Sequence, residues 1–212
     1  MAKPQYAILL DGGFLTKKLY ERAQAHPTAD DVVAECERLK LIPELADYEL
    51  LRIYYYDATP SSRAVKYPVS RNTYNLATTP RFRAAQSLFD QLVLKPQFAL
   101  RMGQVALSPH VWRIKPRVAK ALLRGQRALA DNDFDLDITQ KGVDMRIGMD
   151  MARLALREMV RAVVVVTGDS DFVPSFKFVR REGVKVILEP MGHNVTVELK
   201  QHADIVLEPQ TP

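Results

Sequence analysis

Four aspartates stand where their carboxylates could act together. Asp11 directly follows a short apolar run, Asp169 and Asp171 follow another, and Asp144 opens a helical pattern that precedes the second run. Carboxylates within ~4–6 Å of each other repel, and a cation among them removes that repulsion. Hard divalent cations choose carboxylate oxygens. The sequence therefore predicts that these four aspartates bind Mg²⁺ or Mn²⁺.

A site of this kind suits hydrolysis of a phosphodiester. Bound Mg²⁺ or Mn²⁺ clamps the phosphate and lowers the pKa of a bound water, which then attacks without any nucleophilic side chain. The alternative is that the aspartates are helix caps, since an aspartate before a helix accepts hydrogen bonds from its free N–H groups. Capping accounts for Asp144 and Asp171 singly, but not for acidic residues after two separate apolar runs. The sequence leaves the part played by Asp57 open.

Alternating strand and helix patterns must position these aspartates. We expect strands at 6–10, 50–57, 162–167, 184–188 and 204–207, and helices after Gly13 and at 28–45, 145–159, 172–181 and 195–202. Thr28 is the expected cap of the second helix, and Gly183 ends the 172–181 helix. Strands that alternate with helices predict an α/β fold with a central, mostly parallel sheet and helices on both faces, an α/β/α sandwich. Loops of such a sheet converge at the carboxyl ends of its strands, which is where the aspartates are expected.

The whole chain, 1–212, is expected to be one domain. Prolines interrupt the segment from about 59 to 139, which we interpret as a less regular elaboration at the rim of the sheet. No apolar run approaches the roughly 18 residues that span a membrane, and the N-terminus lacks a signal-peptide pattern. The single cysteine, Cys36, cannot form an internal disulfide. These features predict a cytoplasmic protein without membrane contact, and they leave a homo-oligomer open.

Four segments resemble the signature blocks of the NYN domain family, in its LabA-like branch: Ile8–Gly12, Lys141–Met151, Val166–Pro174 and the tail Leu199–Leu207. The resemblance covers both ends of the chain but not its middle. It implies a PIN-like (Rossmannoid) fold of the PIN-like ribonuclease superfamily, with a divalent-metal site carried by Asp11, Asp144, Asp169 and Asp171. It also implies that Asp150 is an acidic position typical of the family and that Thr167 is a polar neighbour of the metal. Ser170, between the last two aspartates, is a further supporting residue.

One position departs from the family pattern. Many members carry an asparagine after the first aspartate, whereas this chain has Gly12 and Gly13. A protein with this departure could keep the fold and bind RNA without cutting it. The alternative to a ribonuclease is therefore a catalytically weak or inactive PIN-like module that binds RNA or a protein.

Basic residues predict where RNA would bind. The formal net charge of +5 permits contact with a polyanion. Five basic residues have a spacing that places them on one face of a helix starting near Pro116: Arg113, Arg117, Lys120, Arg124 and Arg127. Lys141 and Arg146 flank Asp144. The pattern also fits a solvated helix face, and the expected partner is single-stranded RNA. A second stretch interleaves cations with aromatics, as single-strand binders do: Arg63, Lys66, Tyr67, Arg71, Tyr74, Arg81, Phe82 and Arg83.

The sequence thus predicts an endoribonuclease that hydrolyses RNA phosphodiester bonds with Mg²⁺ or Mn²⁺. A metal-dependent phosphatase of small phosphate esters is a further alternative, since strand-end aspartates serve that chemistry too. Other classes are excluded by their missing residues. The stretch Asp131–Asp137 lacks the glycine and the glutamate of a calcium-binding EF-hand loop, and the histidines show no zinc-like pairing. Gly12 and Gly13 belong to neither a dinucleotide fingerprint nor a P-loop.

Overall fold

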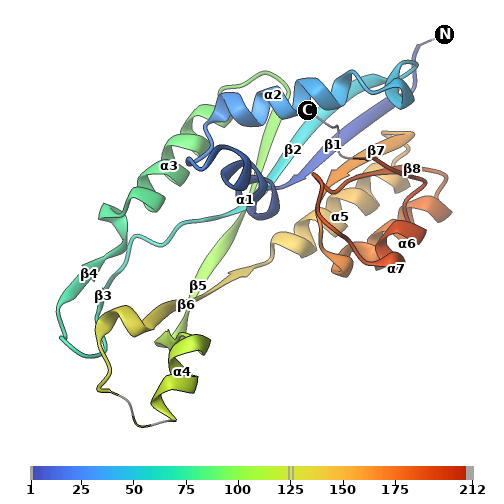
Figure 1. Ribbon diagram of the computed structural model, residues 1–212. Helices are drawn as coiled ribbons and strands as arrows, with labels where there is room; N and C mark the ends of the chain where they lie inside the picture. Colours follow the sequence, from blue (N-terminus) through green and yellow to red (C-terminus); the bar gives the residue numbers. More distant parts are fainter. Residues whose placement is uncertain (1, 124, 126, 209–212) are drawn as a thin grey trace.

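A seven-stranded sheet forms the centre of the protein in the computed structural model, which describes residues 2–123, 125 and 127–208. The strands lie in the order β6-β5-β2-β1-β7-β8-β9 (Figure 1). Their bounds are Gln5–Asp11 (β1), Glu49–Thr59 (β2), Phe98–Ile114 (β5), Phe134–Lys141 (β6), Ala162–Val166 (β7), Lys185–Glu189 (β8) and Ile205–Val206 (β9). Neighbouring strands are parallel, except that β6 is antiparallel to β5. The prediction of a mostly parallel sheet is confirmed.

Helices cover both faces of this sheet (Figure 1). One face carries α1 (Gly12–Ala23), α2 (Ala29–Lys40) and α3 (Pro80–Leu92), and the other carries α5 (Val143–Leu156), α6 (Val173–Arg181) and α7 (Val197–Gln201). Successive residues of a strand point to opposite faces, so each face has its own apolar core. Leu9 of β1 packs in the core beneath α5, α6 and α7, whereas Leu10 packs beneath α1, α2 and α3. The expected α/β/α sandwich is confirmed.

Local signals set several helix ends where they were expected. Thr28 caps α2: its hydroxyl accepts the N–H of Asp31 at 3.3 Å, and the Asp31 carboxylate accepts the N–H of Thr28 at 2.7 Å. The helix ends at Lys40, earlier than predicted, because Pro43 disfavours a helical conformation in the residue before it; a short 3₁₀ turn, η1 (Pro43–Leu45), follows. Gly183, with a φ of +79°, ends α6 as predicted. Within the described ranges, no helix is long and apolar enough to cross a membrane.

The prediction that prolines divide residues 59–139 into short pieces is wrong, whereas β5 and β6 of this segment do lie at one edge of the sheet. This segment contains the 13-residue α3 and the 17-residue β5, and with β6 it adds two strands to the sheet. The prolines do not break these elements. Pro80 and Pro116 are the first residues of α3 and of α4 (Pro116–Leu122), where a missing N–H costs nothing. Pro109 lies where the pairing of β5 with β6 shifts register, so no regular ladder is interrupted.

An arm extends from the body of the sheet (Figure 1). It consists of the distal parts of β5 and β6, α4 and the hairpin of β3 (Ala64–Lys66) and β4 (Thr73–Asn75). The ring centroid of Tyr67 lies 5.1 Å from those of Tyr74 and Trp112, and the indole of Trp112 donates to the carbonyl oxygen of Lys66 at 2.8 Å. These aromatics therefore pack on one another and form a small core that holds the hairpin against β5.

Candidate functional site

Asp11 ends β1 and is the N-cap of α1. One carboxylate oxygen accepts the N–H of Phe14 at 3.1 Å, and the other accepts the hydroxyl of Thr167 at 3.2 Å. Thr167 follows β7, which lies beside β1 with Leu10 opposite Val166. The two polar side chains therefore meet where two adjacent parallel strands end. Thr167 is fully buried, so its hydroxyl fixes one orientation of the Asp11 carboxylate.

The environment of Asp11 disfavours its charge. Burial raises its pKa to about 6, although the hydrogen bonds from Phe14 and Thr167 act in the opposite direction. The negative charges of Asp144 and Asp57 raise this pKa further. Asp11 is thus a carboxylate in a confined place, with other carboxylates near enough to repel it.

The other three predicted aspartates are linked to the same place. Asp169 donates its N–H to the Thr167 hydroxyl at 3.2 Å and accepts the N–H of Asp171 at 2.9 Å, at the start of the 3₁₀ turn η4 (Ser170–Phe172). Asp144 lies in the first turn of α5, and burial together with the charges of Asp169 and Asp171 raises its pKa. We call the edge that holds these four aspartates the aspartate edge.

The four aspartates lie near one another at this edge, but their carboxylates do not converge on one point. In the described part of the chain, no three His, Cys, Asp or Glu side chains are grouped as ligands of one metal ion. Asp144, Asp169 and Asp171 are exposed, while Asp11 is partly buried and held by its two hydrogen bonds. The arrangement therefore has one fixed carboxylate and three exposed ones around it.

The capping alternative holds for different aspartates than expected. Asp11 and Asp169 accept backbone N–H groups at the starts of α1 and η4. Asp144 is not the cap of α5, because Gly142 occupies that position, and Asp171 is not the cap of α6, because Phe172 does. The carboxylates of Asp144 and Asp171 are therefore not needed to start these helices.

Asp57 is an acidic residue of this edge that the sequence left undecided. It lies near the end of β2, and the preceding residue, Tyr56, is opposite Asp11 in the parallel pairing with β1. Asp57 is 8% exposed, and its carboxylate accepts the hydroxyl of Tyr55 at 3.2 Å and the N–H of Ala58 at 2.7 Å. The available signal was that the predicted strand at 50–57 ends in an aspartate, as the run before Asp11 does. Asp57 adds a buried negative charge that acts on Asp11.

Close packing around Gly12 explains why this chain has no asparagine after Asp11. A Cβ atom at this position would lie 2.6 Å from the carbonyl oxygen of Tyr56 and 2.7–2.8 Å from the phenol of Tyr55. Side chains do not approach backbone atoms so closely, so no residue larger than glycine fits. The place next to Asp11 is instead filled by the Tyr55 ring, whose hydroxyl donates to Asp57.

We therefore expect Gly12→Asn to destabilise the protein by about 1–3 kcal/mol, the usual cost of forcing atoms into a packed site. The measurement is urea unfolding followed by circular dichroism. Gly125→Asn is the matched control, because a Cβ atom at Gly125 meets nothing within 4 Å and asparagine tolerates its positive φ. An unfolding midpoint of Gly12→Asn equal to that of the control would contradict the packing of Tyr55 against Gly12.

Two of the supporting residues differ in their surroundings. Asp150, in the middle of α5, accepts the hydroxyl of Tyr56 at 3.0 Å and the Nε–H of Arg101 at 3.1 Å. These partners lie on β2 and β5, so the structure does not bring Asp150 into the group of four aspartates. Ser170 is the first residue of η4 and lies between Asp169 and Asp171.

The five basic residues predicted on one helix face do not share a helix. Arg113 belongs to β5, Arg117 and Lys120 lie in α4, which ends at Leu122, Arg127 follows the helix, and Arg124 lies outside the described residues. The prediction of one helix face is therefore wrong. Gly125, with a φ of +68°, is incompatible with a continued helix. Arg127 pairs with Asp133 at 2.5 and 2.6 Å and lowers the pKa of that carboxyl to about 2.

Two other predicted RNA-binding residues lie beside Asp144. Lys141 is the exposed last residue of β6, directly before the Gly142 cap of α5. Arg146 is exposed and donates to the carbonyl oxygen of Gly142 at 2.7 Å. The aspartate edge is therefore flanked by two cations on the side where α5 begins.

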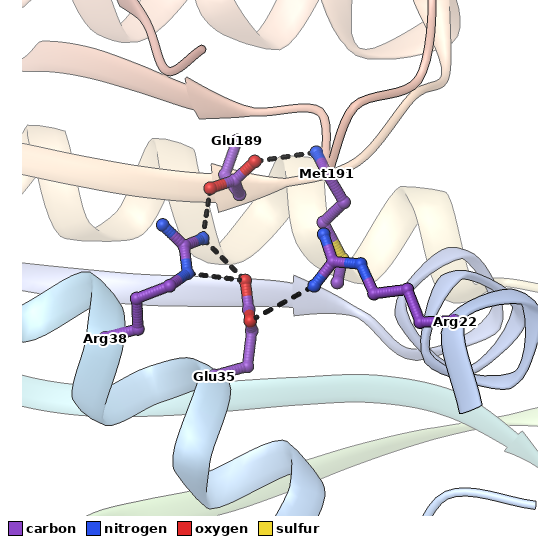
Figure 2. A network of polar contacts seen from close by, with 5 residues as sticks. All are labelled: Arg22, Glu35, Arg38, Glu189 and Met191. Carbon is purple, nitrogen blue, oxygen red and sulfur yellow. Dashed lines mark hydrogen bonds and ion pairs between the residues drawn. The ribbon is translucent and has the colours of Figure 1, made fainter. Parts of the chain in front are cut away.

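On the face of the sheet that carries α1 and α2, Arg38 of α2 joins two buried glutamates (Figure 2). Its guanidinium donates to Glu35 at 2.5 and 3.1 Å and also to Glu189, the last residue of β8. Arg22 lies 3.6 Å from the other oxygen of Glu35, and Glu189 accepts the N–H of Met191 at 2.6 Å. The glutamates are 7% and 2% exposed, so the network ties α2 to the segment that follows β8.

That segment packs against the turn that carries Asp169. A Cβ atom at Gly168 would lie 2.6 Å from the ring of Phe14 and 2.7 Å from the ring of His193. The two rings meet edge to face, with centroids 5.9 Å apart. The absence of a side chain at Gly168 therefore lets the rings of Phe14 and His193 pack against the backbone. Through His193, the segment after β8 helps to hold the turn in place.

Comparisons with known proteins bear on the family and the fold. Residues 117–207 match the family model described as the NYN domain. The match includes Asp144, Asp169 and Asp171 but not Asp11, and it supports the NYN resemblance over this part of the chain. No curated protein matches the chain.

Two solved structures match this chain to different degrees. A protein of unknown function from Vibrio parahaemolyticus RIMD 2210633 matches over 97% of this chain and 94% of its own, at 16% identity and a TM-score of 0.54. At this identity the likeness shows the fold alone. UGT2 of Phytolacca americana, solved with UDP-2fluoro-glucose and pterostilbene, matches over 89% of this chain and 31% of its own, at 9% identity and a TM-score of 0.36. A TM-score this low does not show a shared fold.

Proposed function

We propose that the protein is a divalent-metal-dependent endoribonuclease of the NYN type, in the LabA-like branch of the PIN-like superfamily. The observation that carries the proposal is the hydrogen-bonded line from Asp11 through Thr167 to Asp169, at the carboxyl ends of two adjacent strands. Asp144 lies close enough to be electrostatically coupled to both aspartates. The family match covers three of the four residues.

The residues of the aspartate edge fit a divalent cation by their chemistry. All four offer carboxylate oxygens, which Mg²⁺ and Mn²⁺ prefer. The raised pKa values of Asp11 and Asp144 reflect burial and mutual repulsion, both of which a cation would offset. Asp144, Asp169 and Asp171 are exposed and can turn toward Asp11. When bound there, the metal would clamp a phosphate oxygen and supply an activated water.

The basic residues beside the edge suit an anionic strand. Lys141 and Arg146 lie next to Asp144, and Arg113 and Arg117 are exposed on the arm. Side chains of this kind neutralise backbone phosphates, and binding then weakens as salt rises. We take single-stranded RNA as the substrate. A cytoplasmic location and a homo-oligomer stay predictions.

A second candidate is a PIN-like module that binds RNA or a protein without cutting. Gly12 favours it, because the packing of Tyr55 and Tyr56 leaves no room for the asparagine found in many family members. Cleavage assays decide between the two candidates.

We expect Asp169→Asn to abolish cleavage while the fold is kept, because asparagine can still accept the N–H of Asp171 but lacks the charge that holds a cation. The measurement is the release of products from labelled single-stranded RNA with Mn²⁺ and with EDTA. Asp47→Asn is the control, since Asp47 is exposed and lies before β2, at the amino end of that strand.

Four results would count against this assignment. Full activity of Asp169→Asn would remove Asp169 from the site, and activity that survives EDTA would remove the metal. RNA binding by the wild type without any products would favour the second candidate. Cleavage of small phosphate esters but not of RNA would instead indicate a phosphatase.

A further inference from the structure

A basic pocket lies along α5 from the aspartate edge, between this helix and the strands β2 and β5. It has a volume of about 220 Å³, and its lining includes Arg52, Tyr54, Arg101, Asp150, Arg153 and Met159. This is several times the roughly 30 Å³ that one water molecule occupies in the liquid. We call it the arginine pocket, after Arg52, Arg101 and Arg153.

The pocket carries more positive than negative charge. Arg101 pairs with Asp150 at 3.1 Å, and its guanidinium lies 5.3 Å from the ring centroid of Tyr54. Arg52 and Arg153 are exposed, and neither forms an ion pair with any of the residues described. Three arginines and one aspartate leave a net charge of +2 around the pocket.

Arg101 is fixed in place before any ligand arrives. Asp150 holds its Nε–H and is itself held by the hydroxyl of Tyr56 at 3.0 Å. The ring of Tyr54 stacks with that of Tyr56, with centroids 6.3 Å apart. Because the Nε–H faces Asp150, the outer nitrogens of the guanidinium are available to an anion. A fixed guanidinium loses less conformational freedom when it binds an oxyanion.

The pairing of β2 with β1 and the length of α5 show how far the arginine pocket lies from the aspartate edge. Tyr56, whose hydroxyl reaches Asp150, is opposite Asp11 in the pairing of β2 with β1. Asp144 and Asp150 lie on the same helix, six residues and about 9 Å apart along its axis. A nucleic-acid strand has one phosphate per roughly 3.4 Å of axis in a helical conformation, so this separation corresponds to two or three nucleotides.

We infer that the arginine pocket binds a backbone phosphate of the RNA, two or three nucleotides from the bond that is cut. The inference rests on the proposed ribonuclease function and names a contact through which that site holds its substrate. Arginine suits the role because its planar fork matches phosphate oxygens. A purely structural ion pair would need only Arg101, whereas Arg52 and Arg153 add charge that no described side chain neutralises.

The test uses Arg52→Gln combined with Arg153→Gln, which leaves the Arg101–Asp150 pair intact. Arg157→Gln combined with Arg181→Gln is the matched control, because both arginines are exposed, form no ion pair with the residues described and lie outside the pocket. The affinity for a labelled single-stranded RNA is measured by fluorescence anisotropy in EDTA, over a series of salt concentrations. Inorganic phosphate serves as a competitor.

The pocket variant is expected to bind RNA about tenfold more weakly than the control variant. The slope of log affinity against log salt should fall by about 0.7 for each phosphate that the variant no longer neutralises. In cleavage assays KM should rise while kcat stays unchanged, because the pocket holds the phosphate in both the ground state and the transition state.

Equal RNA affinities of the two double variants would overturn the inference, while cleavage by the wild type would still support the proposed function. A specific loss of affinity in a protein that cuts no RNA would support phosphate binding by the pocket, but it would refute the ribonuclease function and, with it, the stated distance to a cut bond. Weaker binding of inorganic phosphate with unchanged RNA affinity would mean a site for free phosphate, and it would also overturn the inference.

Discussion

Asp11→Asn is expected to lose RNA cleavage by at least about a hundredfold and, at the same time, to stabilise the metal-free protein at pH 7 to 8. The loss follows because Asp11 is the one partly buried carboxylate among the four predicted aspartates, and even residues that only support a metal ligand are worth 10–100-fold. The gain follows because burial and the charges of Asp144 and Asp57 disfavour ionisation of Asp11. Asparagine removes that charge and still accepts the N–H of Phe14.

The pKa of Asp11 determines how the stability gain of Asp11→Asn depends on pH. The pKa of Asp11 is about 6 in the folded protein, against an ordinary value of 3.8. Between these values the folded state binds more protons than the unfolded state, so stability falls as pH rises from about 4 to 6 and stays lower above that range. The full cost is on the order of 2–3 kcal/mol. Asp11→Asn should therefore exceed the wild type in stability at pH 7.5, and the difference should vanish near pH 4.

Thermal unfolding with EDTA at these two pH values measures the stability gain. A second series with Mn²⁺ separates charge from metal binding, because a ligand of the folded state raises the melting temperature. Mn²⁺ should raise the melting temperature of the wild type and of the control Asp47→Asn but not that of Asp11→Asn. A variant that is no more stable than the wild type at pH 7.5 would refute the confined environment of Asp11, and equal Mn²⁺ responses would refute its role as a ligand.

The sequence predicted the part of the edge that depends on local signals. Asp11 and Asp169 follow apolar runs that become the neighbouring strands β1 and β7, and parallel strands place their carboxyl ends together. The same reasoning would have included Asp57, had the register of β2 been known. Register depends on which strands pair, and a single sequence does not contain that information.

Long-range contacts account for most of what the sequence did not predict. Asp150 pairs with Tyr56, 94 residues away, and with Arg101, 49 residues away. The spacing of the basic residues from Arg113 to Arg127 fits a helix. Arg113, however, lies in β5, and the positive φ of Gly125 does not allow the helix to continue. The prolines of the middle segment signalled breaks, whereas they lie at helix starts and at a shift of register, where proline costs little.

Arg38→Met is expected to lower the free energy of unfolding by about 3–5 kcal/mol, the usual cost of leaving buried charges without their partner. Glu35 and Glu189 would lose the guanidinium that they share, and Arg22 lies 3.6 Å from Glu35 alone. Lys40→Met is the matched control. It lies on the same helix and pairs with the exposed Glu37, and surface pairs of this kind contribute at most about 1 kcal/mol.

Urea unfolding at pH 7 measures this effect, with the midpoint as the readout. Combining Arg38→Met with Glu35→Gln and Glu189→Gln should restore most of the stability, since the neutral set no longer buries an unpaired charge. A deficit of Arg38→Met that equals that of Lys40→Met would contradict the stabilising role of the buried network. A deficit that the triple variant does not reduce would show that the loss comes from packing and not from charge.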